Sequence, residues 1–414
     1  MVVAKLISAI SHPKLSVNLI KRKIYWQKIR QESEFSHQPK PLKNIKILST
    51  KFFAKTDFSK FTDLKSADKI LAGNLNIYSS TKLKVAQKIN WHQDYVSGYQ
   101  WPEDIFYQDI LYNYPKGTDI KNPWEISRFQ QMLTMGAAFR KTLGLAAGEN
   151  DQYAQYFECQ ISDWIKDNPI YYGINWKCTM EAAIRVCNWL ISYDLFRQSR
   201  ILKKNSEFYQ LFVGSLAEHG EYIFHNLENL TIKSNHYLSD LASLIWLGLL
   251  CPTLPNAEKW LKFGLTEFKK EILHQFYEDG VNFEASTSYH RLVLEIVAYT
   301  VILCHNHHIK FNKQFYQRLQ KAFGFTSYCL KPNGETPQFG DNDSGRLFIF
   351  ANYFNWNNLD HRYLINLASY LFPKNNLFKS QIIQPECWWL NLQIAKKNLE
   401  KLSGIFSQRS NFNY

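Results

Sequence analysis

The feature that most constrains the fold is a succession of helical segments that begins at Trp124. From there, apolar residues recur three and four positions apart in blocks of about 15–24 residues. Helix-breaking residues separate the blocks, among them Asn168-Pro169 and Asp279-Gly280. The pattern predicts helices near residues 125–145, 150–167, 177–198, 206–228, 237–250, 256–278, 286–308, 312–330 and 360–371.

So many helices with little strand between them predict helical hairpins packed side by side in a mainly α fold. A complete or incomplete (α/α) toroid and an α-solenoid are the natural ways to pack them. A solenoid needs a fixed repeat period, and none is present, so the toroid is favoured. Only 17 Gly and 13 Pro occur in 414 residues, which argues against an all-β chain dense in turns.

The N-terminal part of the chain carries the whole net charge. Residues 1–90 hold 18 Lys and Arg against 5 Asp and Glu, a net charge of +13, whereas residues 91–414 hold 31 of each sign. A basic segment attracts a polyanion such as nucleic acid, anionic lipid or acidic polysaccharide, or it serves as a solvated surface. Nothing in it resembles a nucleic-acid-binding module, so no nucleic acid is expected as a partner.

The composition along the chain predicts three parts. Residues 1–90 form a basic extension of mixed structure, with a helix at Leu15–Ile29 and short strands at Ile45–Leu48 and Leu75–Tyr78. Residues 91–372 form the toroid, and residues 91–123 within it read as an ordered loop. Residues 373–414 form a C-terminal tail.

No membrane span, secretory signal or disulfide framework is expected. The longest uncharged apolar run, Leu241–Cys251, is about half of the roughly 20 residues that a span needs. Lys5 interrupts the apolar N-terminus, so the cytoplasm is the default location, with a periplasmic or exported protein as the alternative. The seven cysteines are odd in number and widely spaced, which favours reduced core thiols.

No cofactor or metal is predicted, because the motifs that hold them are absent. The chain lacks GxxxxGK[ST], GxGxxG, HExxH and GxSxG. Cys304-His305-Asn306-His307-His308 offers adjacent ligands, which rarely build a tetrahedral site. The loop Asp341–Arg346 has Arg346 where a calcium loop needs glycine, and there Arg346 is expected to pair with Asp341 or Asp343.

Two helix starts carry polar residues that can do chemistry. Asn235 and His236 precede the apolar helix 237–250, and a helix N-terminus favours anions. The alternative is that Asn235 merely caps the helix and His236 lies in the core. Tyr289 falls in the first turn of the helix that Ser286 or Thr287 caps. There, the helix dipole and nearby cations would lower its pKa for proton transfer, unless its hydroxyl simply reaches the surface.

These residues belong to a larger set of motifs by which the chain resembles the heparinase II/III-like polysaccharide lyases. The set covers roughly residues 90–350. It consists of Trp91-His-Gln-Asp94, Trp124-Glu125-Ile-Ser-Arg128, Asn175-Trp176 with Glu181 and Arg185, Asn235-His236-Tyr237-Leu238, Asp279-Gly280 with Glu284 and Tyr289-His290-Arg291, and Gly340-Asp341-Asn-Asp-Ser344.

The resemblance implies an α/α toroid followed by an antiparallel β-sandwich, with the active site between them. After Arg346 only 68 residues remain, and Ser403–Ser407 is the one segment that reads as a first strand of such a sandwich. Little or none of the sandwich is therefore expected. The only histidine after residue 308 is His361, although family members often take a further catalytic histidine from the sandwich.

The resemblance also implies residue roles in β-elimination at a uronic acid. Asn235, alone or together with His236, would neutralise the uronate carboxylate so that the C5 proton becomes removable. Tyr289 would donate a proton to the leaving oxygen and is also a candidate base, with His236 as the alternative base. The expected substrate-binding residues are Glu284, His290, Arg291, Asn175 and Trp176, with a structural ion pair as the alternative for Glu284 and Arg291.

The expected function is that of a polysaccharide lyase, a carbon–oxygen lyase that acts on an acidic, uronate-containing glycosaminoglycan or exopolysaccharide. One alternative is an inactive or truncated relative that binds the polysaccharide without cleaving it. A second alternative is a toroid hydrolase, which needs two carboxylates across the scissile bond, and only Glu284 is available without a clear partner.

Overall fold

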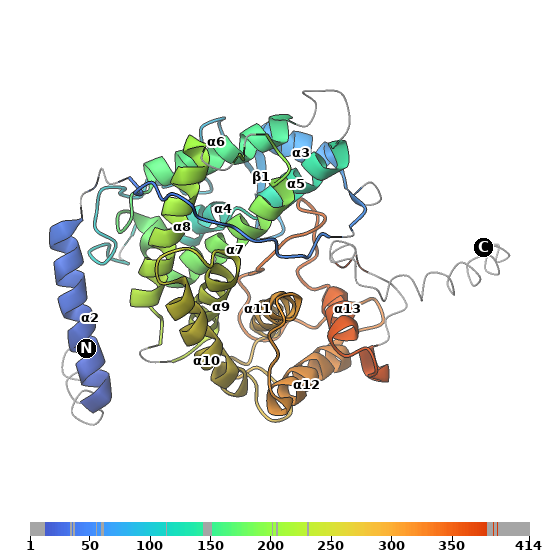
Figure 1. Cartoon of the computed structure of the whole chain (residues 1–414). Coiled ribbons are helices and arrows are strands. Elements are labelled where there is room, and N and C mark those ends of the chain that lie inside the picture. The colour runs from blue at the N-terminus through green and yellow to red at the C-terminus, as the bar shows by residue number, and fades with distance from the viewer. Residues whose placement is uncertain are drawn as a thin grey trace.

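Two layers of antiparallel helices form the body of the protein, shown in Figure 1 as a computed structural model. The structure describes residues 13–378 except 34, 36–37, 55, 59–61, 113, 144–150, 201, 204–205 and 230–231, together with residues 384 and 387. The inner helices are α5 (Gln131–Thr142), α7 (Thr179–Phe196), α9 (Asn235–Leu250) and α11 (Thr287–Asn306). The outer helices are α6 (Asp151–Asp167), α8 (Glu207–His225), α10 (Ala257–Gln275) and α12 (Lys313–Cys329).

The two layers follow from how apolar residues are distributed along each helix. All 18 residues of α7 are buried, whereas α10 buries only seven of its 19 residues, on one face. Each inner helix packs on the next, α5 on α7, α7 on α9 and α9 on α11, and each outer helix covers an inner neighbour. The mainly α toroid of helical hairpins is therefore confirmed.

The predicted helices match the observed ones closely, with one informative exception. The segment predicted as a single helix over 125–145 forms α4 (Lys121–Ser127) and α5, separated at Phe129, whose φ is +59°. A left-handed conformation is unfavourable for phenylalanine. It is held because the fully buried Phe129 ring stacks on Trp91 and meets Trp164 and Trp189 edge-on. Packing in the core overrides the local helical pattern here.

The N-terminal part contributes directly to the toroid core. Helix α2 (Pro13–Glu32) confirms the predicted N-terminal helix and lies along one edge of the array, in blue in Figure 1. Residues 38–90 add buried apolar side chains to the same core, so no break in packing occurs at residue 90. They include α3 (Leu64–Leu71) and the antiparallel hairpin of β1 (Asn74–Ile77) and β2 (Thr81–Lys84).

Of the two predicted strands, one is confirmed and one is wrong. The prediction for Leu75–Tyr78 corresponds to β1. Residues 45–48 form no strand, because the Leu48 amide donates to Leu250 O at the end of α9 rather than to a neighbouring strand. The described residues of 91–120 are irregular, as predicted, but the predicted loop of 91–123 ends earlier because α4 begins at Lys121.

A short apolar segment fills the middle of the toroid. Its residues, Arg346 to Phe350, are all buried and here are called the central segment. The amide of Asn188 on α7 donates to Leu347 O at 2.9 Å, and Gln130 Nε2 donates to Arg346 O at 2.5 Å. Arg346 forms a buried ion pair with Glu295 of α11, which also accepts the Leu347 N–H at 2.8 Å. The expected pairing of Arg346 with Asp341 or Asp343 is therefore wrong.

The chain beyond the central segment continues into α13 (Arg362–Leu371) and a short 3₁₀ turn, η3 (Asn376–Phe378). A second 3₁₀ turn, η2 (Ile174–Trp176), precedes α7.

The predicted sandwich strand at 403–407 lies outside the described residues. All seven cysteines are free thiols, and five are buried as predicted, whereas Cys159 is exposed and Cys329 is partly exposed. None of the helices in the described part of the chain is both long and apolar enough to cross a bilayer.

The buried ion pair of the central segment gives a prediction for stability. Arg346→Met would leave the Glu295 carboxylate buried without its cation, and breaking such a pair costs about 3–5 kcal/mol. A matched control is Lys331→Met, which breaks the exposed Lys331–Glu335 pair and should leave the free energy of unfolding nearly unchanged. Urea unfolding followed by circular dichroism measures both. Equal, small losses would show that the central segment does not depend on this pair.

Candidate active site

The candidate catalytic residues lie at the starts of inner helices. Asn235 and His236 are the first two residues of α9, and Tyr289 lies in the first turn of α11. Because inner helices alternate with antiparallel outer ones, the inner helices run in the same direction and their N-termini share one end of the toroid. The end caps are Ser234, which accepts the His236 N–H, and Ser286, which accepts the Tyr289 N–H. Ser234 therefore replaces Asn235 as the cap of α9.

Asn235 is held by Glu284, which lies in the loop before α11. Asn235 Nδ2 donates to Glu284 Oε2 at 2.8 Å and to Oε1 at 3.1 Å, and the Asn235 backbone N–H donates to Oε1 at 2.9 Å. Asn235 is buried, while Glu284 is partly exposed. The carboxylate therefore fixes the direction of the amide at the start of α9.

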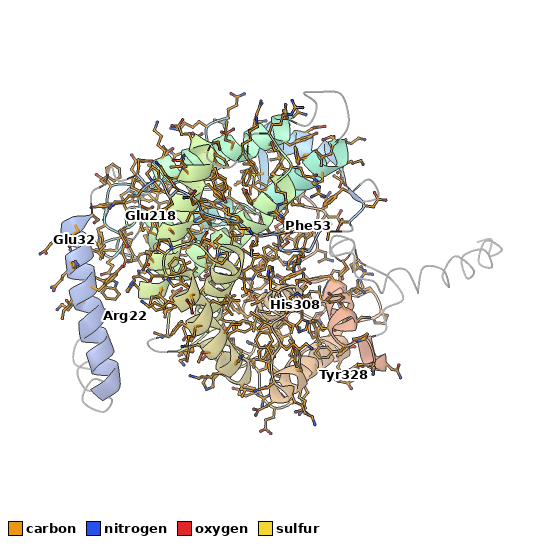
Figure 2. The ribbon with its side chains drawn as sticks, in the orientation of Figure 1. Arg22, Glu32, Phe53, Glu218, His308 and Tyr328 are labelled. Atoms are coloured by element: carbon orange, nitrogen blue, oxygen red, sulfur yellow. The ribbon has the colours of Figure 1, made fainter. Side chains whose placement is uncertain are left out.

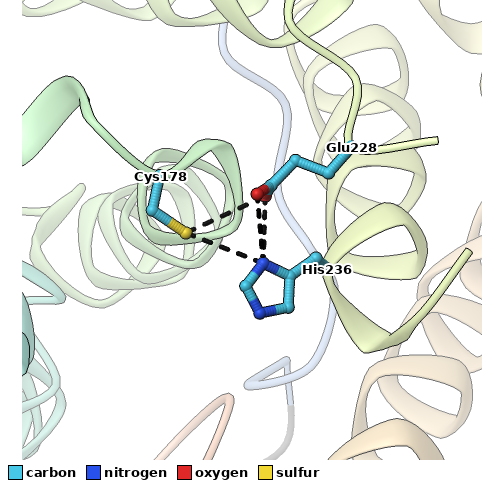
Figure 3. A group of neighbouring side chains, drawn as sticks. All are labelled: Cys178, Glu228 and His236. Atoms are coloured by element: carbon cyan, nitrogen blue, oxygen red, sulfur yellow. Dashed lines mark hydrogen bonds and ion pairs between the residues drawn. The ribbon is translucent and has the colours of Figure 1, made fainter. Parts of the chain in front are cut away.

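His236 lies beside two other reactive groups, shown in Figure 3. Its Nδ1 is 3.1 and 3.2 Å from the carboxylate oxygens of Glu228 and 3.7 Å from Cys178 Sγ. Burial disfavours the charged imidazole, yet the hydrogen bond and charge of Glu228 outweigh it and raise the pKa of His236. Burial and the charge of Glu228 raise the pKa of the Cys178 thiol well above its usual value.

Tyr289 points its hydroxyl at a carboxylate rather than at free solvent. It donates to Asp343 Oδ2 at 2.6 Å, and Lys121 Nζ binds Asp343 Oδ1 at 2.6 Å. Burial and the bond to Asp343 raise the pKa of Tyr289 above its ordinary value, and the charge of Glu284 adds to the effect. The expectation of a lowered tyrosine pKa is therefore wrong, because burial and the carboxylate that accepts the hydroxyl hydrogen bond both favour the neutral phenol.

Glu284 links the starts of the two inner helices that carry the candidate residues. It lies in the loop before α11, five residues before Tyr289, and binds Asn235 at the start of α9. Asn235, His236 and Tyr289 therefore lie at the same end of the toroid, with Glu284 binding Asn235, Glu228 binding His236 and Asp343 binding Tyr289. Their catalytic roles remain predictions.

The motif Trp124-Glu125-Ile-Ser-Arg128 adds a buried charge cluster close to Asp343. Arg128 lies between two carboxylates, with Nη2 at 2.7 Å from Glu181 Oε1 and a short contact to Glu125. Burial raises the pKa of Glu125 to about 7, although Arg128 opposes the shift. Arg128 therefore compensates negative charge behind the site.

A pocket of about 560 Å³ opens next to His236. Glu228 and His236 line it together with two cations, Arg22 and Lys177, and with Tyr112, which is 62% exposed. Arg22, labelled in Figure 2, comes from α2 in the basic N-terminal part, and its Nη2 donates to Asn229 Oδ1 at 2.9 Å. The basic segment thereby brings a guanidinium to the site.

Two of the predicted substrate-binding residues are part of the core. Asn175 has no exposed surface, and its Nδ2 donates to Trp91 O at 2.9 Å and to Asn168 Oδ1 at 2.8 Å. Trp176 is 1% exposed, and its indole N–H donates to Asn168 O. Both side chains are bound to core groups around Asn168 and Trp91, so the structure corrects both assignments: they hold η2 in front of α7.

His290 and Arg291 are buried as well, which corrects their assignment to the substrate. His290 Nε2 lies 3.1 Å from both Ala322 O and Thr326 Oγ1. Arg291 donates to Gly345 O at 3.0 Å and to Asn358 O. It therefore binds the chain before and after the central segment instead of pairing with Glu284. Of the five predicted contact residues, only Glu284 reaches the site.

Several site residues were missed from the sequence because they are far apart in it. Glu228 and Cys178 reach His236 from the loop after α8 and from the N-cap of α7. Lys121 lies 222 positions before Asp343, its partner. The only local signal was the polar loop 341–346, which does supply Asp343. The adjacent histidines of 304–308 serve other contacts, since His305 binds Tyr316 Oη and His307 binds Ser49 O.

Comparison with known proteins gives one consistent result. The profile of the family described as "Heparinase II/III N-terminus" matches residues 45–361. A heparin-sulfate lyase of Bacteroides stercoris is 25% identical over 300 residues, which cover 68% of this chain and 42% of the relative. A heparin-sulfate lyase of Pedobacter heparinus is 23% identical over 241 residues, which cover 56% of this chain and 35% of the relative. The chain thus spans less than half the length of these relatives.

Solved structures show the same fold at low sequence identity. A crystal structure of heparinase III aligns with a TM-score of 0.55 and 17% identity, over 83% of this chain and 48% of that one. A heparan sulfate lyase mutant from Pedobacter heparinus aligns with a TM-score of 0.53 and 18% identity, over 91% of this chain and 52% of that one.

The buried His290 predicts how stability depends on pH. Burial lowers the pKa of His290 to about 4, whereas an unfolded histidine titrates near 6.5. Between these values the unfolded chain binds a proton that the folded chain does not, so stability falls as the pH drops from about 6.5 towards 4, by about 3 kcal/mol in all. Urea unfolding of His290→Gln across this range should show a weaker pH dependence than wild type.

His308→Gln is the control, because His308 is an exposed histidine in the turn after α11. Its pH dependence should follow that of wild type. Parallel curves for wild type and His290→Gln would contradict the assignment of His290 as a neutral core residue.

Proposed function

This chain belongs to the heparinase II/III family, and from that premise we propose that it cleaves a uronate-containing acidic polysaccharide by β-elimination. The observation that carries the proposal is that an amide, an imidazole and a phenol lie at the starts of the neighbouring inner helices α9 and α11, which the bonds between Asn235 and Glu284 hold together. These three groups supply what the reaction needs: a charge neutraliser, a base and a proton donor.

Asn235 is the proposed neutraliser of the uronate carboxylate. Removal of the C5 proton builds negative charge on that carboxylate, and a fixed N–H donor stabilises it as it forms. The Asn235 amide is already oriented by Glu284, so it loses little freedom when the substrate binds. One N–H of Nδ2 has to change partner from Glu284 to the uronate.

Tyr289 is the proposed general acid. In the elimination the C5–H electrons form the C4–C5 double bond, the C4–O bond breaks, and the leaving oxygen takes a proton. The raised pKa of Tyr289 keeps the phenol protonated at neutral pH, which suits this donation better than proton abstraction. His236 is then the candidate base on this chain for the C5 proton.

The basic groups beside His236 support an anionic substrate. Arg22 and Lys177 line the same pocket as His236, and Tyr112 offers an exposed ring for a sugar face. The relatives named heparin-sulfate lyases make heparan sulfate the first polymer to test. Lys121 next to Tyr289 adds a further cation at the site.

The experiment is to incubate the full chain with heparan sulfate and other uronate polymers and to follow the ultraviolet absorbance of the unsaturated product. Growth of that absorbance with polymer shortening supports the lyase. Binding of a polymer without cleavage would support the inactive polysaccharide-binding relative instead. The same assay on shorter and longer oligosaccharides defines what the chain cleaves by itself.

Tyr289→Phe tests the proton donor. The change removes one hydroxyl and keeps the ring, so turnover should fall at least about 100-fold while binding of the polymer persists. Tyr328→Phe is the matched control, because Tyr328 is 79% exposed on the outer helix α12 and should retain the parent rate. A parent rate in Tyr289→Phe would remove Tyr289 from the mechanism.

Asn235→Ala tests the neutraliser. If the amide behaves like one donor to a developing oxyanion, its loss costs about 3 kcal/mol, or roughly 100-fold in turnover. Since Glu284 also loses two hydrogen bonds, thermal unfolding of the variant should be measured alongside to separate instability from lost catalysis. Unchanged turnover in a folded Asn235→Ala variant would contradict the role.

A further inference from the structure

Three side chains beside the candidate active site have the composition of a metal centre. Cys178, Glu228 and His236 each offer one ligand atom, and these atoms lie within 4.8 Å of one another. They come from three separate elements: the N-cap of α7, the loop after α8 and the start of α9. We infer that Cys178, Glu228 and His236 bind one zinc ion.

The spacing of the ligand atoms fits a tetrahedral ion. With usual zinc bond lengths, a tetrahedral site separates sulfur from nitrogen by about 3.6 Å, sulfur from oxygen by about 3.5 Å and nitrogen from oxygen by about 3.3 Å. The corresponding distances are 3.7 Å from Cys178 Sγ to His236 Nδ1, 3.8 Å from Sγ to Glu228 Oε2, and 3.1–3.2 Å from Nδ1 to the Glu228 oxygens. Little movement is needed to place an ion among them.

The geometry does not suit a nucleophilic Cys–His–Glu relay. A relay needs the thiol on one imidazole nitrogen and the carboxylate on the other. Here both groups approach the same nitrogen, Nδ1, as Figure 3 shows, and Nε2 lies on the opposite side of the ring. Three donor groups that meet at one point are instead the pattern of coordination.

The surroundings favour a divalent cation of the zinc type. Thiolate, imidazole and carboxylate together are typical zinc ligands, and three protein ligands leave a fourth position for water. Glu228 and His236 line the 560 Å³ pocket, so that position has access to solvent. Groups outside the ligand set hold Glu228 in place, as is usual for metal ligands. Its Oε2 accepts the Met180 N–H at 2.9 Å, and its backbone N–H donates to the buried Asp240.

Occupancy would change what His236 can do, a consequence that rests on the proposed function. With Nδ1 on the metal, the neutral imidazole carries its proton on Nε2 and cannot accept the C5 proton. Zinc binding would then slow any elimination in which His236 is the base. The metal site itself stands independently of that activity.

The test measures binding on the full chain without any substrate. Equilibrium dialysis should find one zinc ion per chain, and Co²⁺ in its place should give a sulfur-to-cobalt charge-transfer band. Cys178→Ser should abolish the band and weaken zinc binding at least about 10-fold. Cys159→Ser is the control, because Cys159 is an exposed thiol on α6, and it should keep both signals.

Glu228→Gln provides a second variant that keeps the side-chain volume if Cys178→Ser fails to fold. It should weaken zinc binding at least about 10-fold while the sulfur-to-cobalt band persists, since Cys178 remains. Absence of zinc binding by the folded parent, or equal affinity in the parent and both variants, would overturn the inference. Neither result depends on whether the chain cleaves a polysaccharide.

Discussion

The ion pair between Arg346 and Glu295 is the constraint on which the rest of the structure depends. A toroid of helical hairpins leaves a space between its inner helices, and the central segment fills it with Leu347, Phe348 and Phe350. The pair fixes the height of that segment along α11, because Glu295 also accepts the Leu347 N–H. The loop that precedes the segment is held with it, and this loop carries Asp343, the partner of Tyr289. The packing of the central segment therefore helps to position Asp343, which lies only three residues before Arg346.

Much of this architecture could be predicted from the sequence because the helices follow from the local spacing of apolar residues. The three-and-four spacing located the helices, and the Asp279-Gly280 turn and the Ser286 cap located the start of α11. The break at Phe129 could not be predicted, since its cause is a cluster of aromatic rings contributed by distant segments. Residues 45–48 have the alternating apolar pattern of a strand because alternate side chains are buried. Their backbone nevertheless forms no strand, since the backbone group within hydrogen-bonding reach belongs to the end of helix α9.

The candidate site was predictable in part. Polar residues at the start of an apolar helix are conspicuous, which is how Asn235, His236 and Tyr289 were found. The same logic failed for His290 and Arg291, because α11 is buried on every side from His290 to Cys304. Tyr289 therefore reaches the site, whereas the next two residues along α11, His290 and Arg291, point into the core and bind groups there. Partners such as Glu228 cannot be predicted from a local sequence pattern, because only the packing of the helical hairpins brings them to His236.

The balance of charge at this end of the toroid explains how a site rich in carboxylates can still face a polyanion. Part of its negative charge is compensated: Arg128 lies between Glu125 and Glu181, Lys121 binds Asp343, and the neutral Asn235 amide donates to Glu284. Burial also raises the pKa of Glu125 to about 7, which reduces its negative charge at neutral pH, and Arg22 and Lys177 line the pocket beside His236. The region around Glu228 differs, because the buried carboxyl of Asp240 lies next to it and burial, with the charge of Glu228, raises the pKa of Asp240 well above its usual value. Asp240 therefore stays protonated, and the carboxylate of Glu228 faces the imidazole of His236 and the thiol of Cys178, the two groups with which it would hold a cation.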